Sequence, residues 1–332
     1  MDPIIHGAHI AANLLGIDVS TFKLLIGAIG LVLLGTSFHR QNYGGVIFAI
    51  LGWPFIGLFF YLDIPHYAQI GDVVLIIMSA ATLPATITLA LWEWRKHVKG
   101  EVEEALVWLR GAVFWSAMPY LLISKVPYLN AAIVIFTAWC AIIFLRFSGL
   151  TNLEMGPLTI DSANGTEVVW SAWEGNRYIL TETLGDGGFF VPIVQSNGDP
   201  IYIGIILACS ALQSMIIFIG AIGALRTAPI KRRIRALLVV LPTIHVLNIF
   251  RNAGIIWLHL AYPNWNIFGL SIFDFAHSYA AKGGSLFAMF LIAFVLFDLL
   301  PDMHKHVMKL LDPILNAIDS TEKWVKKQLR FT

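Results

Sequence analysis

Charge and cysteine are both scarce in this sequence. Of its 332 residues only 13% are charged and two are cysteines, whereas 58% are hydrophobic. Soluble domains carry about 25% charged residues, so this chain is too apolar to cover a surface that faces water. These values exclude the soluble-enzyme, fibrous and disordered classes, and they predict a polytopic membrane protein.

Other absences narrow the function. A formal net charge of +1 gives no general attraction to nucleic acid. The two cysteines, Cys140 and Cys209, exclude a disulfide framework and a cysteine-rich metal site. We expect neither a metal nor a cofactor. Because residues 1–18 lack a basic region and a small-residue cleavage site, we also expect no cleaved signal peptide.

Eight stretches are apolar enough to predict membrane helices, each of which needs about 20 residues. These stretches are residues 22–38, 46–62, 70–92, 105–124, 129–147, 202–225, 236–260 and 272–300. Glycine and proline inside them are tolerated, because neighbouring helices satisfy the freed backbone groups. The predicted fold class is therefore an all-α polytopic membrane protein with about seven to eight membrane helices.

Basic residues mark the cytoplasmic side of a membrane protein. Most of the 22 lysines and arginines gather in four clusters: Arg40; Arg95, Lys96 and Lys99; Arg226, Lys231, Arg232, Arg233 and Arg235; and Lys305, Lys309, Lys323, Lys326, Lys327 and Arg330. Since all four clusters should face the cytoplasm, we expect an outside N-terminus and a cytoplasmic C-terminus.

The helix count conflicts with this placement of charge. Three predicted helices lie between the second and third clusters, and an odd number of crossings would put these clusters on opposite sides. One of the three must fail to cross. Residues 105–124, which contain Arg110 and Pro119, could lie at the inner interface. Alternatively, residues 129–147 could form a re-entrant or interfacial helix at the outer face. Hydropathy favours the first alternative.

Two segments outside the apolar stretches have their own character. Residues 149–200 form the single long polar insert, in which β-type runs at 158–160, 167–173, 178–183 and 189–194 alternate with glycine-rich turn signals. We expect a small extracellular β-rich cap, with a glycosylation sequon at Asn164. The tail from residue 301 alternates lysine with apolar residues at helical spacing. We expect it to be an amphipathic helix on the inner membrane surface.

Polar residues recur inside the last three predicted helices, where ionisable groups are costly and indicate function. Residues 202–225 carry Cys209, Ser210, Gln213 and Ser214 on one arc. Residues 236–260 carry a stripe of His245, Asn248, Asn252 and His259, with Arg251 at its flank. Residues 272–300 begin with a polar face that contains Asp274, His277, Ser278, Lys282 and Ser285.

Depth brings three of these residues together. At 1.5 Å per residue, Cys209 lies about 10 Å, Arg251 about 13 Å and His277 about 8 Å from the outer end of their predicted helices. Such a trio suits acyl transfer. A thiol reacts as its thiolate, which a neighbouring cation stabilises. His277 could act as general base and acid, oriented by Asp274, and Arg251 could stabilise the thiolate or an oxyanion.

Structural interpretations remain open for each residue taken singly. A lone cysteine in a membrane helix is usually a small buried hydrophobe, and Cys140 is assigned that role. Arg251 could simply pair with Asp274. The Asn and His side chains of the stripe could link helices by hydrogen bonds.

Three sequence motifs resemble the exosortase and archaeosortase family, most of all its archaeosortase A branch. They are Ala-Cys-Ser-Ala-Leu-Gln-Ser at 208–214, Leu-Asn-Ile-Phe-Arg-Asn at 247–252 and Phe-Ala-His-Ser at 275–278. The resemblance covers residues 105–300, and the N-terminal helices in 1–104 carry no matching motif. The third motif is the least specific, since some archaeosortases use a second arginine there. This sequence offers His277 or Lys282.

The resemblance implies a membrane cysteine peptidase or transpeptidase that acts on secreted surface proteins. Its substrates carry a C-terminal sorting signal, made of a Pro-Gly-Phe-type motif, a membrane helix and a basic cluster. Cleavage is followed by transfer of the new C-terminus to a membrane lipid. On this pattern Cys209 is the nucleophile, Arg251 the stabiliser and His277 the acid/base. The supporting residues are Asp274, Asn248, Asn252, Gln213, Ser210 and Lys282.

The family pattern also affects the boundaries. It favours residues 129–147 as the segment that does not cross, and it makes 105–300 a catalytic membrane region, 149–200 its insert and 301–332 a cytoplasmic tail. A different function class stays open: a transporter or channel whose polar pathway is lined by His245, Asn248, Arg251 and Asp274. The lack of an internal repeat counts against it.

Overall fold

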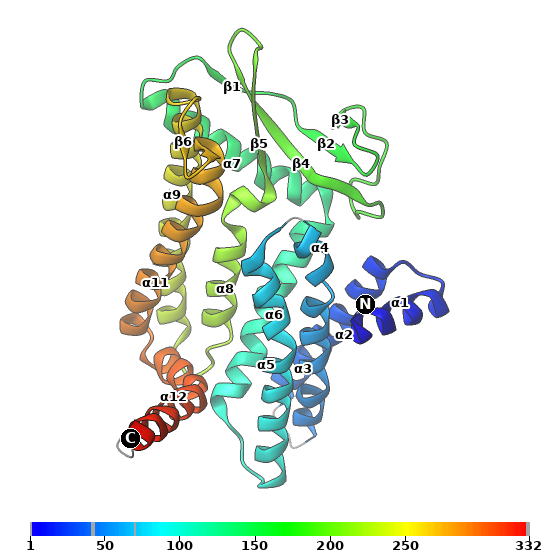
Figure 1. The fold of residues 1–332 in the computed structure, drawn as a ribbon, viewed down its shortest axis with the longest axis vertical. Coiled ribbons are helices and arrows are strands. Elements are labelled where there is room, and N and C mark those ends of the chain that lie inside the picture. The colour runs from blue at the N-terminus through cyan, green and yellow to red at the C-terminus, as the bar shows by residue number, and fades with distance from the viewer. Residues whose placement is uncertain (1, 41–43, 70, 330–332) are drawn as a thin grey trace. The chain divides into compact units, whose positions relative to one another are not determined.

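The computed structural model describes residues 2–40, 44–69 and 71–329, most of them helical (Figure 1). The α-helices are α1 Pro3–Leu15, α2 Val19–His39, α3 Gly45–Tyr61, α4 Ile64–Gln69, α5 Val73–Val98, α6 Glu104–Lys125, α7 Pro127–Phe147, α8 Leu212–Gly223, α9 Ile230–Ala261, α10 Ile272–Phe275, α11 Ala281–Leu299 and α12 Pro301–Leu329. A 3-10 turn, η1, covers Leu207–Ser210, and a π-helical turn, η2, covers Ala276–Ala280. Arg330, counted in the last basic cluster, lies outside the described residues.

Seven helical segments in the described part of the chain are long and apolar enough to cross a membrane. They are Val19–His39, Gly45–Gln69, Val73–Val98, Glu104–Lys125, Pro127–Phe147, Ile230–Ala261 and Ile272–Leu299. The coarse part of the predicted class is confirmed: the described chain is mostly helical, has seven helices that could span a membrane, and contains small sheets. Both 105–124 and 129–147, the two segments suspected of not crossing, fall inside helices that meet the criteria of length and composition.

The predicted helix at 202–225 is wrong. Residues 200–206 form strand β5 (Pro200–Ile206), because Ile201, Ile203 and Ile205 point inward while the alternate residues face outward. A hydropathy window averages over this period of two and so mistakes the strand for the start of a helix. The helix α8 that follows has 12 residues, so it is about 18 Å long, shorter than the ~30 Å apolar layer of a membrane. Of the three helices predicted between the second and third basic clusters, only this one is shorter than the apolar layer in the described chain.

The insert forms a five-stranded antiparallel sheet. Its strands are β1 Leu153–Met155, β2 Thr159–Ser162, β3 Glu167–Val169, β4 Leu184–Gln195 and β5. The long strand β4 pairs with β1, β2 and β5. The predicted runs at 158–160, 167–173 and 189–194 overlap strands, although β3 ends at Val169. The predicted run at 178–183 is not a strand, since its backbone forms bends. A second small sheet pairs β6 Asn266–Ile267 with β7 Leu270–Ser271.

The described chain divides into two compact units, each treated by itself below. Unit 1 comprises residues 1–115, 220–227 and 302–332, and unit 2 comprises 116–219 and 228–301. Helices α6 and α8 contribute residues to both units.

Unit 1 is built on three helices, in which α3 packs against both α2 and α5. Small residues set the spacing between its helices. A Cβ atom at Gly111 of α6 would overlap the ring of Phe38 at the end of α2, so glycine lets these helices approach closely. The side chain of Arg110, the residue before Gly111, is 3% exposed and lies between α5 and α2. Its partners there are Glu93 and Ser37.

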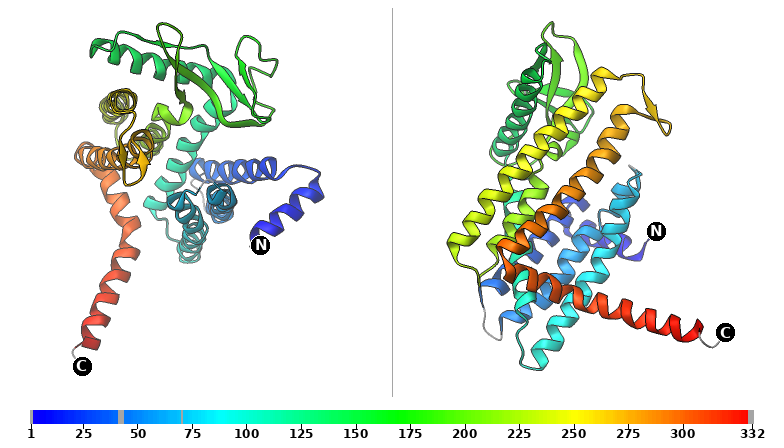
Figure 2. Two further views of the ribbon diagram at one scale, coloured as in Figure 1. Left: turned by 45° about the horizontal axis from the view of Figure 1, so that its top comes forward. Right: turned by 90° about the vertical axis from the view of Figure 1, so that its left-hand side faces the viewer.

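Unit 2 packs the sheet against helices. One apolar cluster joins α7, the strands β1, β4 and β5, and α9. In Figure 1 helix α7 lies beside this sheet. Helices α9 and α11 run side by side, as both Figure 1 and the right-hand view of Figure 2 show. The turn η1, with Cys209, joins β5 to α8 and packs on α7 and α9. This arrangement places Cys209 between the sheet and the polar part of α9.

Candidate functional site

The site starts from a tight turn between β5 and α8. Cys209 and Ser210 end the turn η1, and Ala211 follows with a left-handed backbone (φ 57°). A residue with a Cβ atom pays about 1–2 kcal/mol in that conformation. The Ser210 hydroxyl holds the turn, because it donates to the carbonyl of Leu207 (2.6 Å) and accepts from the amide of Leu212 (3.2 Å). Strained turns of this kind persist where the surrounding structure holds them.

Two asparagines of α9 hold the backbone of Cys209. The side-chain amides of Asn248 and Asn252 both donate to the Cys209 carbonyl, at 2.8 and 2.9 Å. Asn248 and Asn252 are 5% and 3% exposed, so these hydrogen bonds are shielded from water. A spacing of four residues puts both amides on one face of the helix. We call this pair the asparagine clamp. The clamp fixes the backbone of Cys209 against the turn of α9 that also carries Arg251, the residue directly before Asn252.

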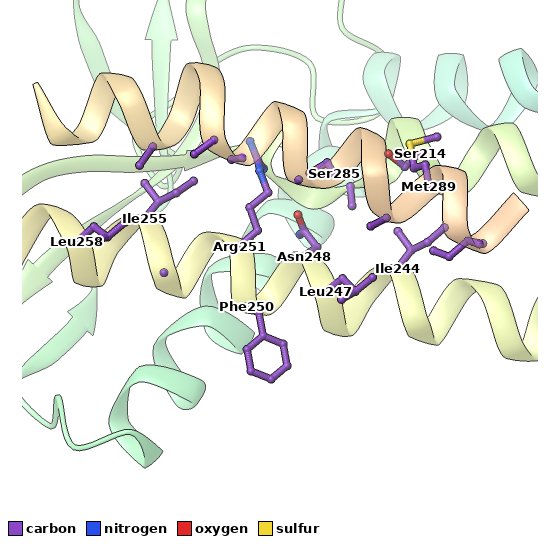
Figure 3. Close-up of a pocket in the computed structure, with 18 residues that line it drawn as sticks. Ser214, Ile244, Leu247, Asn248, Phe250, Arg251, Ile255, Leu258, Ser285 and Met289 are labelled. Carbon is purple, nitrogen blue, oxygen red and sulfur yellow. The ribbon is translucent and has the colours of Figure 1, made fainter. Parts of the chain in front are cut away.

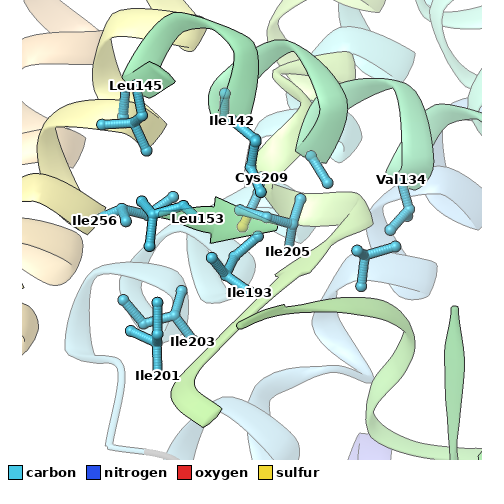
Figure 4. Packing of buried hydrophobic residues seen from close by; sticks show 14 residues of the cluster. Val134, Ile142, Leu145, Leu153, Ile193, Ile201, Ile203, Ile205, Cys209 and Ile256 are labelled. Atoms are coloured by element: carbon cyan, nitrogen blue, oxygen red, sulfur yellow. The ribbon is translucent and has the colours of Figure 1, made fainter. Parts of the chain in front are cut away.

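The thiol of Cys209 lies in the apolar cluster of unit 2. Figure 4 shows it among side chains that include Ile142, Ile193 and Ile205. Cys209 is 8% exposed and lies outside the seven segments that could cross a membrane. Burial raises the pKa of this thiol, while a backbone contact with Ile206 and the charge of Arg251 act in the opposite direction. Burial therefore favours the protonated thiol in the described conformer.

Arg251 lines a cavity of about 390 Å³ between α9 and α11, with residues of α8 at one side. We call it the α9–α11 cavity. Figure 3 shows the Arg251 side chain reaching from α9 toward α11. The Nε atom of Arg251 is buried without a hydrogen-bond partner, and one Nη donates weakly to Asn252 at 3.5 Å. Among the described residues no carboxylate forms an ion pair with this guanidinium.

The rest of that cavity is lined by small and apolar side chains. Alanine, glycine and serine dominate its α11 side: Ala276, Ala280, Ala281, Gly284, Ser285 and Ala288. Asn248, Ser214 and Ser285 are the other polar side chains of the lining. Cys209 does not line the cavity, although its neighbour Ala211 does. A charged group in so apolar a surrounding is a candidate binding point for an anion or an oxyanion.

His277 lies in η2, the π-helical turn that follows α10. Its ring stacks on Phe273, with 5.6 Å between ring centroids and an interplanar angle of 6°. Arg251, Lys282 and Asp274 lie near enough for their charges to act on the imidazole. Single π turns inside α-helices are common at functional sites, because the extra residue redirects the side chains of one turn. The segment thus lies near enough to Arg251 for the two side chains to interact electrostatically. The predicted depth of Cys209 rested on a helix at 202–225, whose first part is strand β5 and turn η1 instead.

The predicted partnership of Asp274 with His277 is not formed. Asp274 is exposed, accepts a hydrogen bond from the Ser271 hydroxyl (2.7 Å) and has its own amide capped by that hydroxyl (3.1 Å). The sequence Ser-x-x-Asp at the start of a helix favours this cap. The hydrogen bond to Ser271 therefore competes with the predicted hydrogen bond from Asp274 to His277. Asp274 also forms no ion pair with Arg251 in the described structure. Lys282 is exposed in the first turn of α11.

The remaining candidates lie apart from the cavity. Gln213 is exposed, and its amide is 3.5 Å from the Tyr120 hydroxyl. His245 contacts Cys140, with 3.7 Å between Nε2 and Sγ, and stacks on Phe136. It is thus Cys140, the cysteine assigned a packing role, that has a histidine neighbour. Of the four residues proposed for a transport pathway, Asn248 and Arg251 line the α9–α11 cavity and His245 and Asp274 do not.

Three features of the site were missed from the sequence: the asparagine clamp, the left-handed Ala211 and the small-residue lining of α11. The spacing of Asn248 and Asn252 placed them on one stripe but did not show that both would meet a single carbonyl. The run of alanine, glycine and serine after residue 276 was the available signal for the cavity, since such residues leave space beside a neighbouring helix.

Together the fold and the site define a mostly helical protein with seven helices that could span a membrane, and with an arginine at the α9–α11 cavity that has no carboxylate partner among the described residues. Within the described residues no group of three or more His, Cys, Asp or Glu side chains is placed to hold a metal ion. No family model, no curated protein and no solved structure matches this chain. The candidate function therefore rests on the motifs and on this geometry.

Proposed function

We propose that this protein is a membrane cysteine peptidase/transpeptidase of the archaeosortase type. Its substrates are secreted or surface-layer proteins that carry a C-terminal sorting signal: a short Pro-Gly-Phe-type motif, a membrane helix and a basic cluster. The enzyme cleaves near the motif through a thioester on Cys209 and passes the new C-terminus to a lipid acceptor. The observation that carries this proposal is Arg251, a guanidinium without a carboxylate partner one residue from the clamp that holds Cys209.

The proposed reaction has two steps. In the first, His277 takes the proton of the Cys209 thiol, the thiolate attacks the scissile carbonyl, the peptide C–N bond breaks, and His277 gives the proton to the leaving amine. In the second, a hydroxyl or amine of the acceptor attacks the thioester and loses its proton to His277. The C–S bond breaks, and the proton passes to the leaving thiolate, which regenerates the Cys209 thiol. Arg251 stabilises the negative charge that develops on the carbonyl oxygen in both steps, and it stays protonated throughout.

The proposal requires a second conformer of Cys209. In the described conformer the thiol packs in the apolar cluster, where burial disfavours the thiolate. Reaction needs the side chain to turn toward Arg251 while the asparagine clamp keeps the backbone in place. Such a change would couple thiolate formation to the arrival of substrate.

The proposal includes an orientation. The basic clusters are cytoplasmic, residues 129–147 lie at the outer face without crossing, and the β-rich insert 149–200 is extracellular. The site lies in the outer half of the membrane, where the soluble part of the substrate is already outside. The amphipathic helix α12 lies on the inner surface. A cysteine introduced at Lys125, in a chain that lacks Cys140 and Cys209, tests part of this topology. Labelling by a membrane-impermeant maleimide from outside the cell is expected, and labelling only after lysis would contradict it.

Processing of a sorting-signal substrate tests the chemistry. We expect Cys209→Ala to abolish processing while the protein stays folded and in the membrane, and His277→Ala to be severely impaired. The matched control is Cys140→Ala, which removes the other cysteine and should be nearly silent. Normal processing by Cys209→Ala would refute the mechanism. Loss of processing in Cys140→Ala with retention in Cys209→Ala would assign the reaction to the Cys140–His245 pair instead.

A further inference from the structure

Unit 1 contains a second cavity, of about 360 Å³, which we call the arginine cavity. It lies where the end of α2, the start of α6, residues 224–227 and α12 meet. Three arginines line it, namely Arg40, Arg110 and Arg226, together with Glu104 and His306. Its other lining residues are Ser37, Phe38, Val46, Val102, Val107, Trp108, Ala224 and Thr227. None of these residues belongs to the candidate site of unit 2.

Arg226 is held in a fixed position at this cavity. One of its Nη atoms donates to the carbonyl of Phe38 at 2.6 Å, and the guanidinium lies 3.8 Å from the centroid of the Phe38 ring. Phe38 itself is 3% exposed. A guanidinium has five N–H donors, so most of those on Arg226 remain available to a ligand. Because the ring and the carbonyl orient the group, less conformational freedom is lost on binding.

The charges of the cavity do not cancel. Arg110 is neutralised by Glu93, to which it donates through Nε and Nη2. Burial lowers the pKa of His306, whose ring stacks on Trp108, so the imidazole is neutral at pH 7. Arg40 and Arg226 form no ion pair within the described part of the chain, and Glu104 is the only carboxylate among the lining residues. The cavity therefore keeps a positive charge.

The position of the cavity along the helices indicates what could supply an anion. Helix α2 ends at His39, and α6 begins at Glu104. Both ends therefore lie at the boundary of an apolar segment, the level at which lipid headgroups meet a membrane protein. Basic pockets between membrane helices on the cytoplasmic side, where we expect the clusters with Arg40 and Arg226, bind anionic headgroups. Planar guanidinium groups match the paired oxygens of a phosphate, which they bind through two parallel hydrogen bonds.

We propose that the arginine cavity binds a phosphate group through Arg226 and Arg40. The group belongs either to an anionic phospholipid or to free phosphate. Arg110 lines the cavity with its charge neutralised by Glu93. The stacked rings of Trp108 and His306 line another part of it. This site is independent of the proposed acyl transfer, because it lies in unit 1 and uses none of the residues of that reaction.

Native mass spectrometry of the purified full-length chain in detergent tests this proposal. The probes are a short-chain phosphatidylglycerol, the matching phosphatidylcholine and inorganic phosphate. We expect phosphatidylglycerol to bind at least tenfold more tightly than phosphatidylcholine. Each of Arg226→Gln and Arg40→Gln should weaken that binding about tenfold, because a charge-assisted hydrogen bond is lost. Inorganic phosphate that displaces the lipid identifies phosphate itself as the ligand. Failure to displace it identifies the lipid headgroup.

Two further variants separate charge from folding. Thr227→Glu keeps both arginines and places a carboxylate at the cavity, and it should weaken phosphatidylglycerol binding as much as Arg226→Gln does. Arg95→Gln removes an exposed charge near the end of α5 that does not line the cavity, and it should leave binding unchanged within twofold. The proposal is overturned if phosphatidylcholine binds as tightly as phosphatidylglycerol. It is also overturned if the three cavity variants behave like Arg95→Gln, or if neither lipid nor phosphate binds.

Discussion

Two arginines lie inside apolar helices of this chain, and their surroundings differ. Arg110 in α6 is 3% exposed and donates to both carboxylate oxygens of Glu93 and to the Ser37 hydroxyl. Arg251 in α9 lies at the α9–α11 cavity, with a buried Nε that has no partner and one long contact to Asn252. The first guanidinium is paired with a carboxylate and a hydroxyl, whereas the second has no carboxylate partner among the described residues.

The difference indicates how an intramembrane charge is used. A buried ion pair costs much to desolvate and adds little net stability, but it is costly to break once formed. Arg110 therefore belongs to the architecture of unit 1. An arginine that is held in apolar surroundings without a counter-ion is expensive, and it persists where function requires it. The comparison predicts that substitutions of the two residues separate stability from activity.

The largest expected effect is on the stability of unit 1. Arg110→Met leaves Glu93 as an uncompensated buried carboxylate, so we expect a loss of about 3–5 kcal/mol in the free energy of unfolding. Titration with dodecyl sulfate, followed by circular dichroism, measures it. The double variant Glu93→Met/Arg110→Met removes both charges and should recover most of the loss. A single variant as stable as the parent chain would show that this pair is not the buried contact described above.

Arg251→Gln should produce the opposite pattern. We expect about a 10²–10³-fold fall in kcat for the processing of a sorting-signal peptide, the usual effect of losing one oxyanion donor. Its unfolding midpoint should stay close to that of the parent chain, because no ion pair is broken. Arg251→Lys should recover only part of the rate, since an ammonium lacks the planar donor pair. A large loss of stability with unchanged kcat would make Arg251 a structural residue like Arg110.

The asparagine clamp should have an intermediate effect. Asn248→Ala or Asn252→Ala alone leaves the Cys209 carbonyl with one donor, and each should cost about 1 kcal/mol of stability. The double variant leaves that buried carbonyl without a partner and should cost about 1–3 kcal/mol. It should also lower kcat, because the Cys209 turn is released. Additive single effects, with no change in kcat, would mean that the clamp does not position the thiol.

The smallest expected effect is on the titration of Cys209. Since burial raises its pKa, the resting thiol should be alkylated by iodoacetamide more slowly than a free cysteine at pH 7.5, and the rate should rise with pH. The charge of Arg251 lowers this pKa, so Arg251→Gln should move the rate profile to higher pH. A Cys140→Ala background leaves Cys209 as the only target. An unchanged profile would mean that Arg251 is too distant to act on the thiol.

Much of the helical architecture could be predicted from composition and hydropathy. A long apolar run such as 22–38 or 272–300 permits few alternatives to a helix. The segment at 202–225 was misread because its isoleucines alternate with a period of two, and the partner strand β4 is needed to recognise the sheet. Local hydropathy contains no information about such a partner.

The site was less predictable than the fold. The sequence grouped Asn248, Arg251 and Asn252 because residues three and four apart share a helix face. The sequence did not indicate that the Cys209 thiol packs in the apolar cluster and does not line the cavity. It also did not indicate that the Asp274 carboxylate accepts a hydrogen bond from Ser271. Both outcomes depend on how the chain packs. The ion pair of Arg110 with Glu93 was likewise missed, because the two residues are 17 positions apart and lie on different helices.

The most direct test of the proposed function is a covalent one. The Cys140→Ala protein is mixed with a sorting-signal peptide, quenched in acid after a short reaction, and its intact mass is measured. We expect an increase equal to the mass of the N-terminal peptide fragment, mapped to Cys209 and released by hydroxylamine, as a thioester requires. Peptide cleavage without an adduct, an adduct on another residue, or no reaction at all would contradict the proposal that Cys209 is the nucleophile.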